Sequence, residues 1–442
     1  MNTKVSDVFK TTGRPTVTYV QRESGALEKK LRGYIEEGGQ LCLITGPSKT
    51  GKTTLYKQVL NEAHREPLVV QCTKDKKCED IWKEALEGVN FERASSSSAK
   101  SGKKAVLSGE FSGQLGWSWL AKAVGKGSLI LEKNSEETEI RERILSRPSP
   151  DLLIPILKHT HYVLIIEDFH YLDDKEKVLL FQQWKRFIDC EISILVLGTT
   201  HRAVDIAQSN PDLVGRIAQI DVKQWTVSDL IKICESGFQH LKSEITTYQK
   251  EKIASESVGL PILTQQICLE IYNKKNIYTI HDARKQQIAI NDKYINSCLN
   301  SIASERYSQF GTYFNTLVRG PRENSRKYKT YELVLYCFTI DPIQFDLTRS
   351  EIDKRIATIE LDSSERPPAA SINSTLGALK QFQDRREFQL LEWRPSEDKL
   401  YIVEPSFLFY VRWRENKEDS AGRQLDFLEI LLNTSGNPLR KG

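Results

Sequence analysis

Short apolar runs alternate with segments of helical periodicity over the first half of the chain. The runs predict buried strands, because each is short and is bounded by glycine or polar residues. Between them, apolar residues recur every three or four positions, which predicts helices. The expected strands cover 41–45, 68–71, 163–166 and 192–197, and the expected helices begin near 27, 52, 79 and 180. This alternation is typical of a parallel sheet with helices on both faces.

The alternation is interrupted between about residues 91 and 134. The stretch 94–104 is a low-complexity segment of serine, lysine and alanine. The stretch 104–131 is rich in glycine, valine, leucine and tryptophan, which predicts a β-hairpin or helical insertion. Its tryptophans, Trp117 and Trp119, are expected to pack in a core rather than to form a binding platform.

From Thr226 onward the pattern becomes helical. Thr226 and Asp229 have the spacing of a helix cap, and Pro261 suits the first turn of a further helix. These segments predict an α-helical lid over 226–318, which follows a core over 1–225. A basic linker over 319–330 comes next.

The last part of the chain predicts a small separate domain over 331–442. Helices are expected at 331–338, after a cap at Thr348, and at 371–382, and hairpin strands at 388–393 and 400–403. Three helices followed by a hairpin are the order of a winged-helix domain. The whole chain is thus expected to be an α/β protein, a parallel sheet flanked by helices, followed by a helical lid and a winged helix.

Composition excludes several classes of protein. The 442 residues are 39% hydrophobic and 28% charged, so a soluble globular protein is expected. Apolar runs are too short to span a membrane, and Met1–Lys10 lacks the apolar core of a signal peptide. The eight cysteines form no C-x-x-C pair, which suits a reducing compartment. We expect a cytoplasmic protein with no membrane partner. A net charge of +4 is too small to indicate a nucleic-acid binder by itself.

Neither the histidines nor the serines predict a catalytic or metal site of their own. The seven histidines are scattered without metal-ligand spacing, and no G-x-S-x-G motif is present. His170 is expected to pack or hydrogen-bond beside the acidic residues that precede it.

A glycine-rich loop between the first expected strand and the following helix carries the strongest chemical signal. It matches G-x-x-x-x-G-K-[ST], the phosphate-binding P-loop, and comprises Gly46, Pro47, Ser48, Lys49, Thr50, Gly51, Lys52, Thr53 and Thr54. Its glycines let backbone N–H groups surround phosphates, and the helix N-terminus adds positive potential. Lys52 would neutralise β- and γ-phosphate charge, and the Thr53 hydroxyl would bind Mg²⁺. The expected ligands are ATP and Mg²⁺.

Two acids end the strand at 163–166, at the sheet edge where the loop lies. One would hold Mg²⁺ and the other would orient the attacking water. We assign Glu167 to the metal and Asp168 to water activation.

These motifs resemble those of P-loop ATPases of the AAA+ and STAND type, and most closely the origin-recognition-like subgroup, in which Glu-Asp-hydrophobic-His acidic strands are common. The segment 195–202 is similar to the strand that ends in a sensor, which makes Thr200 a γ-phosphate contact. The segment 211–217 resembles one that carries an arginine finger, so Arg216 is a catalytic candidate; an ordinary surface ion pair is the alternative. Pro261 lies in a G-x-P motif similar to that of the lid, and Val20 and Arg22 lie in a segment similar to one that packs on adenine.

The resemblance implies a nucleotide-dependent switch with ATPase activity that controls protein docking or assembly. The resemblance to STAND proteins implies a role in prokaryotic signalling or defence. Two alternatives stay open: a DNA-binding ATPase of initiator or transposition-helper type, and a nucleotide-binding scaffold that does not hydrolyse ATP.

The charge of the expected winged helix favours protein docking over DNA. Its third helix carries only Lys380, with Arg385 and Arg386 just beyond, and its wing turn at 394–399 is charge-balanced. Phosphate contacts dominate DNA affinity, so this module has few of the cations it would need. The basic stretch 319–329 could supply them.

Overall fold

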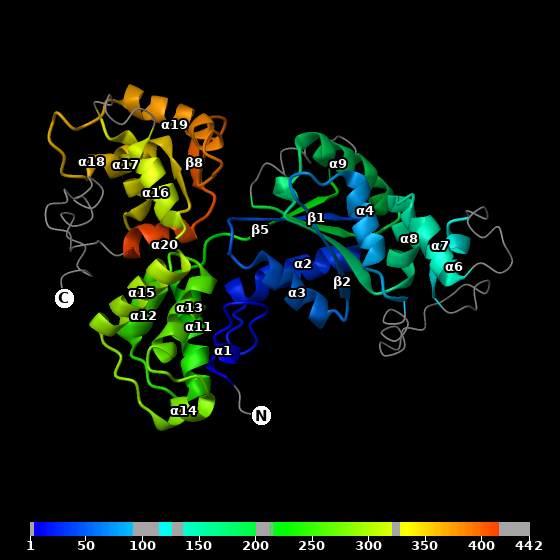
Figure 1. The fold of residues 1–442 in the computed structure, drawn as a ribbon, viewed down its shortest axis with the longest axis horizontal. Helices are drawn as coiled ribbons and strands as arrows, with labels where there is room; N and C mark the ends of the chain where they lie inside the picture. Colours follow the sequence, from blue (N-terminus) through cyan, green and yellow to red (C-terminus); the bar gives the residue numbers. More distant parts are fainter. Residues whose placement is uncertain are drawn as a thin grey trace. The chain divides into compact units, whose positions relative to one another are not determined.

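The computed structural model describes residues 4–91, 115–125, 136–199, 213, 215–320 and 328–414. The chain divides into two compact units (Figure 1). The sheet unit consists of 21–46 and 51–222, and the helical unit consists of 1–20, 47–50 and 223–442.

The sheet unit is built on five parallel strands. They are β1 (Leu41–Thr45), β2 (Glu66–Gln71), β3 (Tyr162–Glu167), β4 (Ile194–Leu197) and β5 (Ile217–Asp221). Their order is β2-β3-β4-β1-β5, and each neighbouring pair is parallel. The four strands expected from the sequence are therefore confirmed, and β5 is an additional edge strand. Because the carboxyl ends of parallel strands share one edge, the ends of β1 and β3 come together there.

Helices cover both faces of this sheet, as the alternation predicts. They are α2 (Ala26–Glu37), α3 (Lys52–Glu62), α4 (Cys78–Glu87), α6 (Trp117–Ala123), α7 (Glu137–Leu145), α8 (Pro150–His159) and α9 (Asp174–Asp189). Successive residues of β1 point to opposite faces: Cys42 packs in one core with Tyr56, and Leu43 packs in another with Trp184. Two apolar cores thus fix the sheet between its helical layers.

The insertion contributes one described helix, α6. Trp119 is buried and meets Phe91 and His159 edge-on, while Trp117 is half-buried against Phe91. Packing of the two tryptophans is confirmed for these residues. Most of the stretch 91–134 lies outside the described residues.

The first part of the helical unit is a bundle. It contains α11 (Val227–Leu241), α12 (Thr247–Glu256), α13 (Pro261–Asn273), α14 (Ile280–Lys285), α15 (Asp292–Arg306) and α16 (Phe310–Arg319). Thr226 caps α11 by accepting from the N–H of Asp229 at 3.2 Å, and Pro261 is the first residue of α13, both as expected. A short N-terminal helix, α1 (Val5–Val8), precedes Phe9, whose ring occupies the space that a Cβ at Gly237 would fill.

The C-terminal part of this unit contains α17 (Thr330–Thr339), β6 (Asp346–Thr348), α18 (Arg349–Ala357), α19 (Ala369–Asp384), β7 (Leu391–Arg394), β8 (Lys399–Ile402) and α20 (Ser406–Trp413). The expected helices and hairpin strands are present. Thr348 caps α18 through Glu351, as its spacing predicts. The three strands pair antiparallel in the order β6-β8-β7. β6 and α20 are additional.

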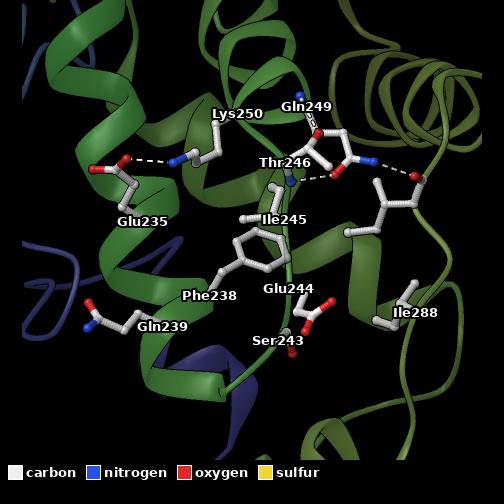
Figure 2. Close-up of a pocket in the computed structure, with 11 residues that line it drawn as sticks. Glu235, Phe238, Gln239, Ser243, Glu244, Ile245, Thr246, Gln249, Lys250 and Ile288 are labelled. Carbon is white, nitrogen blue, oxygen red and sulfur yellow. Dashed lines mark hydrogen bonds and ion pairs between the residues drawn. The ribbon is translucent and has the colours of Figure 1, made fainter.

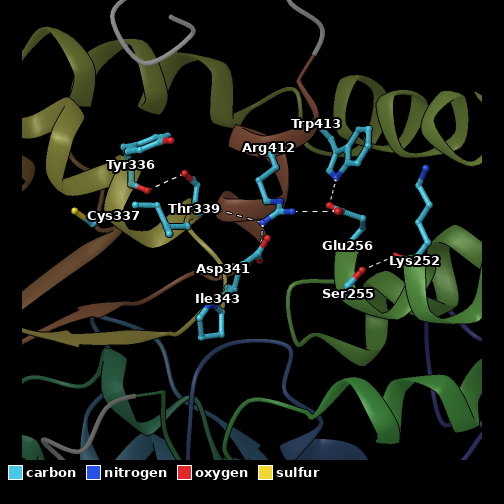
Figure 3. Close-up of polar contacts among 12 residues, drawn as sticks. Lys252, Ser255, Glu256, Tyr336, Cys337, Thr339, Asp341, Ile343, Arg412 and Trp413 are labelled. Carbon is cyan, nitrogen blue, oxygen red and sulfur yellow. Dashed lines mark hydrogen bonds and ion pairs between the residues drawn. The ribbon is translucent and has the colours of Figure 1, made fainter. Parts of the chain in front are cut away.

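A buried polar cluster joins the bundle to the C-terminal part of the helical unit (Figure 3). Glu256, at the end of α12, is 1% exposed and accepts from Arg412 Nη2 at 3.1 Å and from Trp413 Nε1 at 2.7 Å. Arg412, 6% exposed, also donates to Asp341 Oδ1 at 3.2 Å and to the Thr339 carbonyl at 3.3 Å. Around the cluster, one continuous apolar core runs from α11 to α20.

Among the described residues, no helix is both long and apolar enough to cross a membrane. All eight cysteines carry free thiols.

Candidate functional site

The glycine-rich loop connects β1 to α3, which is the strand–loop–helix context that the motif requires. Gly46 and Gly51 have φ values of 141° and 100°, in the region that side chains rarely adopt. Gly51 is the residue immediately before α3, so the loop ends at the amino terminus of that helix. Free backbone N–H groups of a first helical turn attract anions, so this is a suitable place for phosphates.

Lys52 already points into the loop. Its Nζ donates to the carbonyl of Gly46 at 2.8 Å, across the mouth of the turn. This places the ammonium group where the chain reverses direction, near the backbone that would surround a phosphate.

The middle of the loop, Pro47–Thr50, belongs to the helical unit. Thr50 is buried and donates through Oγ1 to the Pro47 carbonyl at 2.9 Å, which closes the turn. Ser48 is half-buried, and Lys49 is exposed with a positive φ of 64°. Lys49 Nζ lies 3.1 Å from Glu404 Oε1 of the same unit. Thr54, back in the sheet unit, is half-buried in the first turn of α3.

At the end of β3, Glu167 meets two hydroxyl groups of α3. Its Oε1 accepts from Thr53 Oγ1 at 3.0 Å and from Tyr56 Oη at 3.2 Å. Mg²⁺ takes oxygen ligands, and it is usually held by one or two protein side chains together with phosphate and water. A hydroxyl and a carboxylate in contact, beside a phosphate loop, therefore fit that ion. Thr53 and Glu167 are the residues that would hold it.

Asp168 comes directly after β3, and its backbone departs from the extended conformation of the strand. Its φ is 57°, a left-handed conformation that starts the short helix η3 (Phe169–Tyr171). Its Oδ2 accepts from Gln71 Nε2 at 3.0 Å. Gln71 is the last residue of β2 and is paired in register with Glu167. The two acids thus have different partners: hydroxyls of α3 for Glu167, and an amide of β2 for Asp168.

The sequence did not single out Gln71 or Tyr56. A glutamine at the end of the expected strand 68–71 was a weak signal that polar groups gather at this edge. Tyr56, 0% exposed, follows the period of α3 and reads as a core residue. Burial raises the pKa of Tyr56, and the nearby Glu167 carboxylate raises it further, so the phenol stays protonated and donates.

His170, which follows the two acids, is half-buried and packs against its neighbour Tyr171. Its ring lies 4.2 Å from that of Tyr171, between centroids. Burial lowers the pKa of His170 to about 4; the Asp168 charge opposes this, and the Lys52 and Lys177 charges add to it. His170 is therefore neutral near pH 7.

The remaining candidates lie apart from this cluster in the chain. Arg216 is about half exposed and forms an ion pair with Asp189 Oδ1 at 2.9 Å, which is the alternative that the sequence left open. In the sheet unit, Arg22 is buried in the short helix η1 (Arg22–Gly25). In the helical unit, Val20 packs against Leu230, and Pro261 starts α13. Thr200 lies outside the described residues.

The helical unit also contains an open hollow between α11, α12 and the stretch 288–290 (Figure 2). Its volume is about 790 Å³, and its lining includes none of the residues that the sequence assigns to nucleotide. Glu235 and Lys250 form an ion pair of 2.6 Å at one side, and Phe238 and Ile245 supply an apolar floor.

A five-stranded parallel sheet between helical layers, whose β1 continues through a glycine-rich loop into a helix, is the fold of the P-loop NTPases. Residues 35–206 match the family described as the AAA domain, which makes this part of the chain an ATP-binding, AAA-type P-loop NTPase domain. A search of curated proteins found no match.

Several solved structures align with most of the length of the chain. The Walker-type ATPase PABY2304 of Pyrococcus abyssi is 16% identical, with a TM-score of 0.51 over 92% of this chain and 99% of that one. The Aeropyrum pernix ORC2 protein, in its ADPNP–ADP complexes, is 11% identical, with a TM-score of 0.45 over 91% and 95%. The RuvB Holliday junction branch migration motor of Thermotoga maritima is 15% identical, with a TM-score of 0.35 over 88% and 94%. At 16% identity, the likeness to PABY2304 concerns the fold alone.

Proposed function

We propose that the chain is a Mg²⁺-dependent ATPase whose nucleotide state controls docking of a protein partner or self-assembly. The observation that carries this proposal is the 3.0 Å contact between Thr53 Oγ1 and Glu167 Oε1, at the start of the helix that follows the loop. It brings together the two side chains that we propose hold the ion, although 114 residues separate them in the chain.

Each side chain of the site has a defined task in this proposal. Lys52 and the loop amides bind the phosphates, while Thr53 and Glu167 hold the ion, which neutralises charge on the β- and γ-phosphates. Asp168, which accepts a hydrogen bond from Gln71, orients the attacking water. Arg216 acts as an arginine finger at the site of a neighbouring copy, and Val20, Arg22, Thr200 and Pro261 complete the nucleotide contacts.

We further propose that the residues from about 331 form a winged-helix domain, after a lid over 226–318 and a linker over 319–330. The order α17, β6, α18, α19, β7 and β8 supports this assignment, because a winged helix has three helices followed by a hairpin. In this arrangement α19 is the third helix, and the turn between β7 and β8 is the wing.

The charges of the wing favour a protein partner over DNA. Arg394 is paired with both Glu392 and Glu397, and Lys399 lies 2.8 Å from Asp346. These cations are already neutralised within the module, whereas binding to DNA phosphates requires cations that can displace the counterions condensed on the DNA. A protein partner, recognised by shape and hydrogen bonds, suits this surface better than DNA does.

A continuous apolar core connects the proposed lid to the proposed winged-helix domain from about 331, which is the docking module. The lid is therefore suited to transmit a change of nucleotide state to that module. The apolar core from α11 to α20 and the buried Glu256–Arg412 pair bind the lid to the C-terminal part. A change in the lid would therefore move the docking surface with it. Full conversion of such a switch requires about 10⁴-fold preference of the nucleotide for one state.

Calorimetry with ATP and mass measurement with ATP, ADP and no nucleotide test the proposal. We expect ATP binding that requires Mg²⁺ for full affinity, and a mass that depends on the nucleotide or on an added partner. Lys52→Ala should weaken binding about 10- to 100-fold, the value of one or two charge-assisted hydrogen bonds. Failure of the pure protein to bind any nucleoside triphosphate would overturn the proposal.

Two further measurements test for ATP hydrolysis and for DNA binding. Turnover that is lost in Asp168→Ala while ATP still binds would exclude a scaffold that does not hydrolyse ATP. Salt-sensitive DNA binding that is lost in Arg385→Glu would favour a DNA-loaded ATPase over protein docking.

A further inference from the structure

Tyr56 links the apolar core of the sheet unit directly to the acidic end of β3. Its ring is fully buried together with Leu31, Ile44 and Val59, and its hydroxyl donates to Glu167 Oε1 at 3.2 Å. Because packing fixes the ring, the position of the hydroxyl is fixed as well. A donor held in this way restrains its acceptor more firmly than a mobile surface side chain would.

Tyr56 and Thr53 act on the same carboxylate oxygen. They are three residues apart in α3, which places both side chains on one face of the helix. Each donates to Oε1 of Glu167, at 3.2 and 3.0 Å. A carboxylate oxygen has two lone pairs, so these donors saturate Oε1 and leave the second oxygen for the ion or its water.

We propose that Tyr56 is a positioning residue for the metal site: its phenol orients the Glu167 carboxylate toward Mg²⁺ in the nucleotide complex. This inference rests on the proposed function, because it assumes that Thr53 and Glu167 hold the ion. It adds a residue that the loop motif and the acidic strand do not contain. Partners that orient metal ligands commonly change metal affinity by 10- to 100-fold when they are removed.

A purely structural role makes a different prediction. A buried tyrosine hydroxyl needs a hydrogen-bond partner, and Glu167 would supply one even if no metal were ever bound. In that case the loss of the hydroxyl would change stability but not the dependence of nucleotide binding on the metal.

The test is Tyr56→Phe, which retains the buried ring and removes only the donor. The dissociation constant for ATP is measured in EDTA and in saturating Mg²⁺, and the ratio of the two is the gain due to the metal. We expect this ratio to fall about tenfold in Tyr56→Phe, with the EDTA value within about twofold of the wild type. Electron paramagnetic resonance of Mn²⁺ with ATP should show a parallel loss of protein-bound ion.

Tyr162→Phe is the matched control. Its hydroxyl donates to the Asn90 carbonyl at 3.2 Å and accepts from the Asn90 N–H at 3.1 Å, in the same unit and distant from the loop in the sequence. Tyr56→Phe loses one hydrogen bond and Tyr162→Phe loses two, so the control should lose at least as much stability, but only Tyr56→Phe should reduce the gain due to the metal.

Three results would overturn the inference. Two unchanged dissociation constants, and hence an unchanged ratio, would make Tyr56 a core residue only. Equal weakening in EDTA and in Mg²⁺ would show that it supports the loop rather than the ion. A wild-type protein that gains nothing from Mg²⁺ would overturn the metal site of the proposed function as well, whereas the first two results leave that function intact.

Discussion

The side-chain amide of Gln71 donates a hydrogen bond of 3.0 Å to Asp168, across the ends of β2 and β3. Asp168 has a left-handed backbone, so its carboxylate leaves the line of the strand and depends on a partner for its orientation. Gln71 is that partner, and it reaches Asp168 because β2 is paired in register beside β3. The acid assigned to water activation is therefore oriented by a neighbouring strand rather than by the phosphate loop.

Replacing Gln71 with leucine should lower kcat about fivefold and leave the dissociation constant for ATP unchanged. The loss of a hydrogen bond to a charged group at a partly exposed site is worth about 1 kcal/mol, which corresponds to this factor. Single-turnover hydrolysis separates the chemical step from binding. A rise in kcat would contradict this, and would mean that Gln71 restrains Asp168 instead of orienting it.

Substitution of Arg216 distinguishes an arginine finger from an ordinary surface ion pair. An exposed ion pair such as Arg216–Asp189 is worth less than about 1 kcal/mol, so Arg216→Ala should barely change the free energy of unfolding. A finger supplied to a neighbouring copy is worth about 10³-fold or more in kcat. We therefore expect Arg216→Ala to lose turnover while retaining ATP binding, and Asp189→Ala, which keeps the arginine, to retain both.

A mixing experiment checks whether Arg216 acts between copies. Lys52→Ala retains the finger but not the phosphate site, and Arg216→Ala retains the site but not the finger. Neither variant alone should turn over, and a mixture should recover part of the activity. Normal activity of Arg216→Ala would leave only the ion pair that the structure contains.

Much of the sheet could be predicted because continuous apolar runs report burial on both faces. The runs at 41–45 and 163–166 correspond to β1 and β3 within one or two residues. β5 was missed because it lies at the edge, where Gln219 and Asp221 interrupt the apolar positions and burial alternates. α8 was missed as well, since Pro155 within it lowers its helical signal.

The candidate site was predictable only where a local motif carries it. The loop and the two acids are contiguous patterns, so Lys52, Thr53 and Glu167 could be named from the sequence. Tyr56 and Gln71 act through contacts between elements, and these depend on how α3 packs on β3 and on the register of β2. No spacing rule along the chain encodes such contacts.

His170 should make stability depend on pH between about 4 and 6.5. Burial lowers its pKa to about 4 in the folded protein, so over this range the unfolded chain binds more protons. Stability therefore rises with pH across this window and is lost as pH falls from about 6.5 toward 4, by about 2–3 kcal/mol in total. Unfolding in denaturant at pH 7, 6 and 5 measures this slope.

His170→Gln should remove that part of the slope, because glutamine does not titrate. Equal slopes for His170→Gln and the wild type would show that other groups cause the dependence.

Removing only one partner of the buried pair Glu256–Arg412 should lower the free energy of unfolding strongly, whereas replacing both partners should lower it little. Glu256→Ala leaves the arginine, which is 6% exposed, without its main counterion, and we expect a loss of about 3–5 kcal/mol. Replacing both residues with methionine removes both charges and should recover most of that loss, since apolar packing often matches a buried ion pair.

Glu235→Ala, which breaks the more exposed pair with Lys250, is the control and should cost less than about 1 kcal/mol. Unfolding followed by the fluorescence of Trp413 and the other tryptophans measures all three. A loss in Glu256→Ala no larger than that in Glu235→Ala would show that the cluster does not hold the bundle to the C-terminal part of the helical unit. Coupling in the proposed switch would then have to run through the apolar core alone.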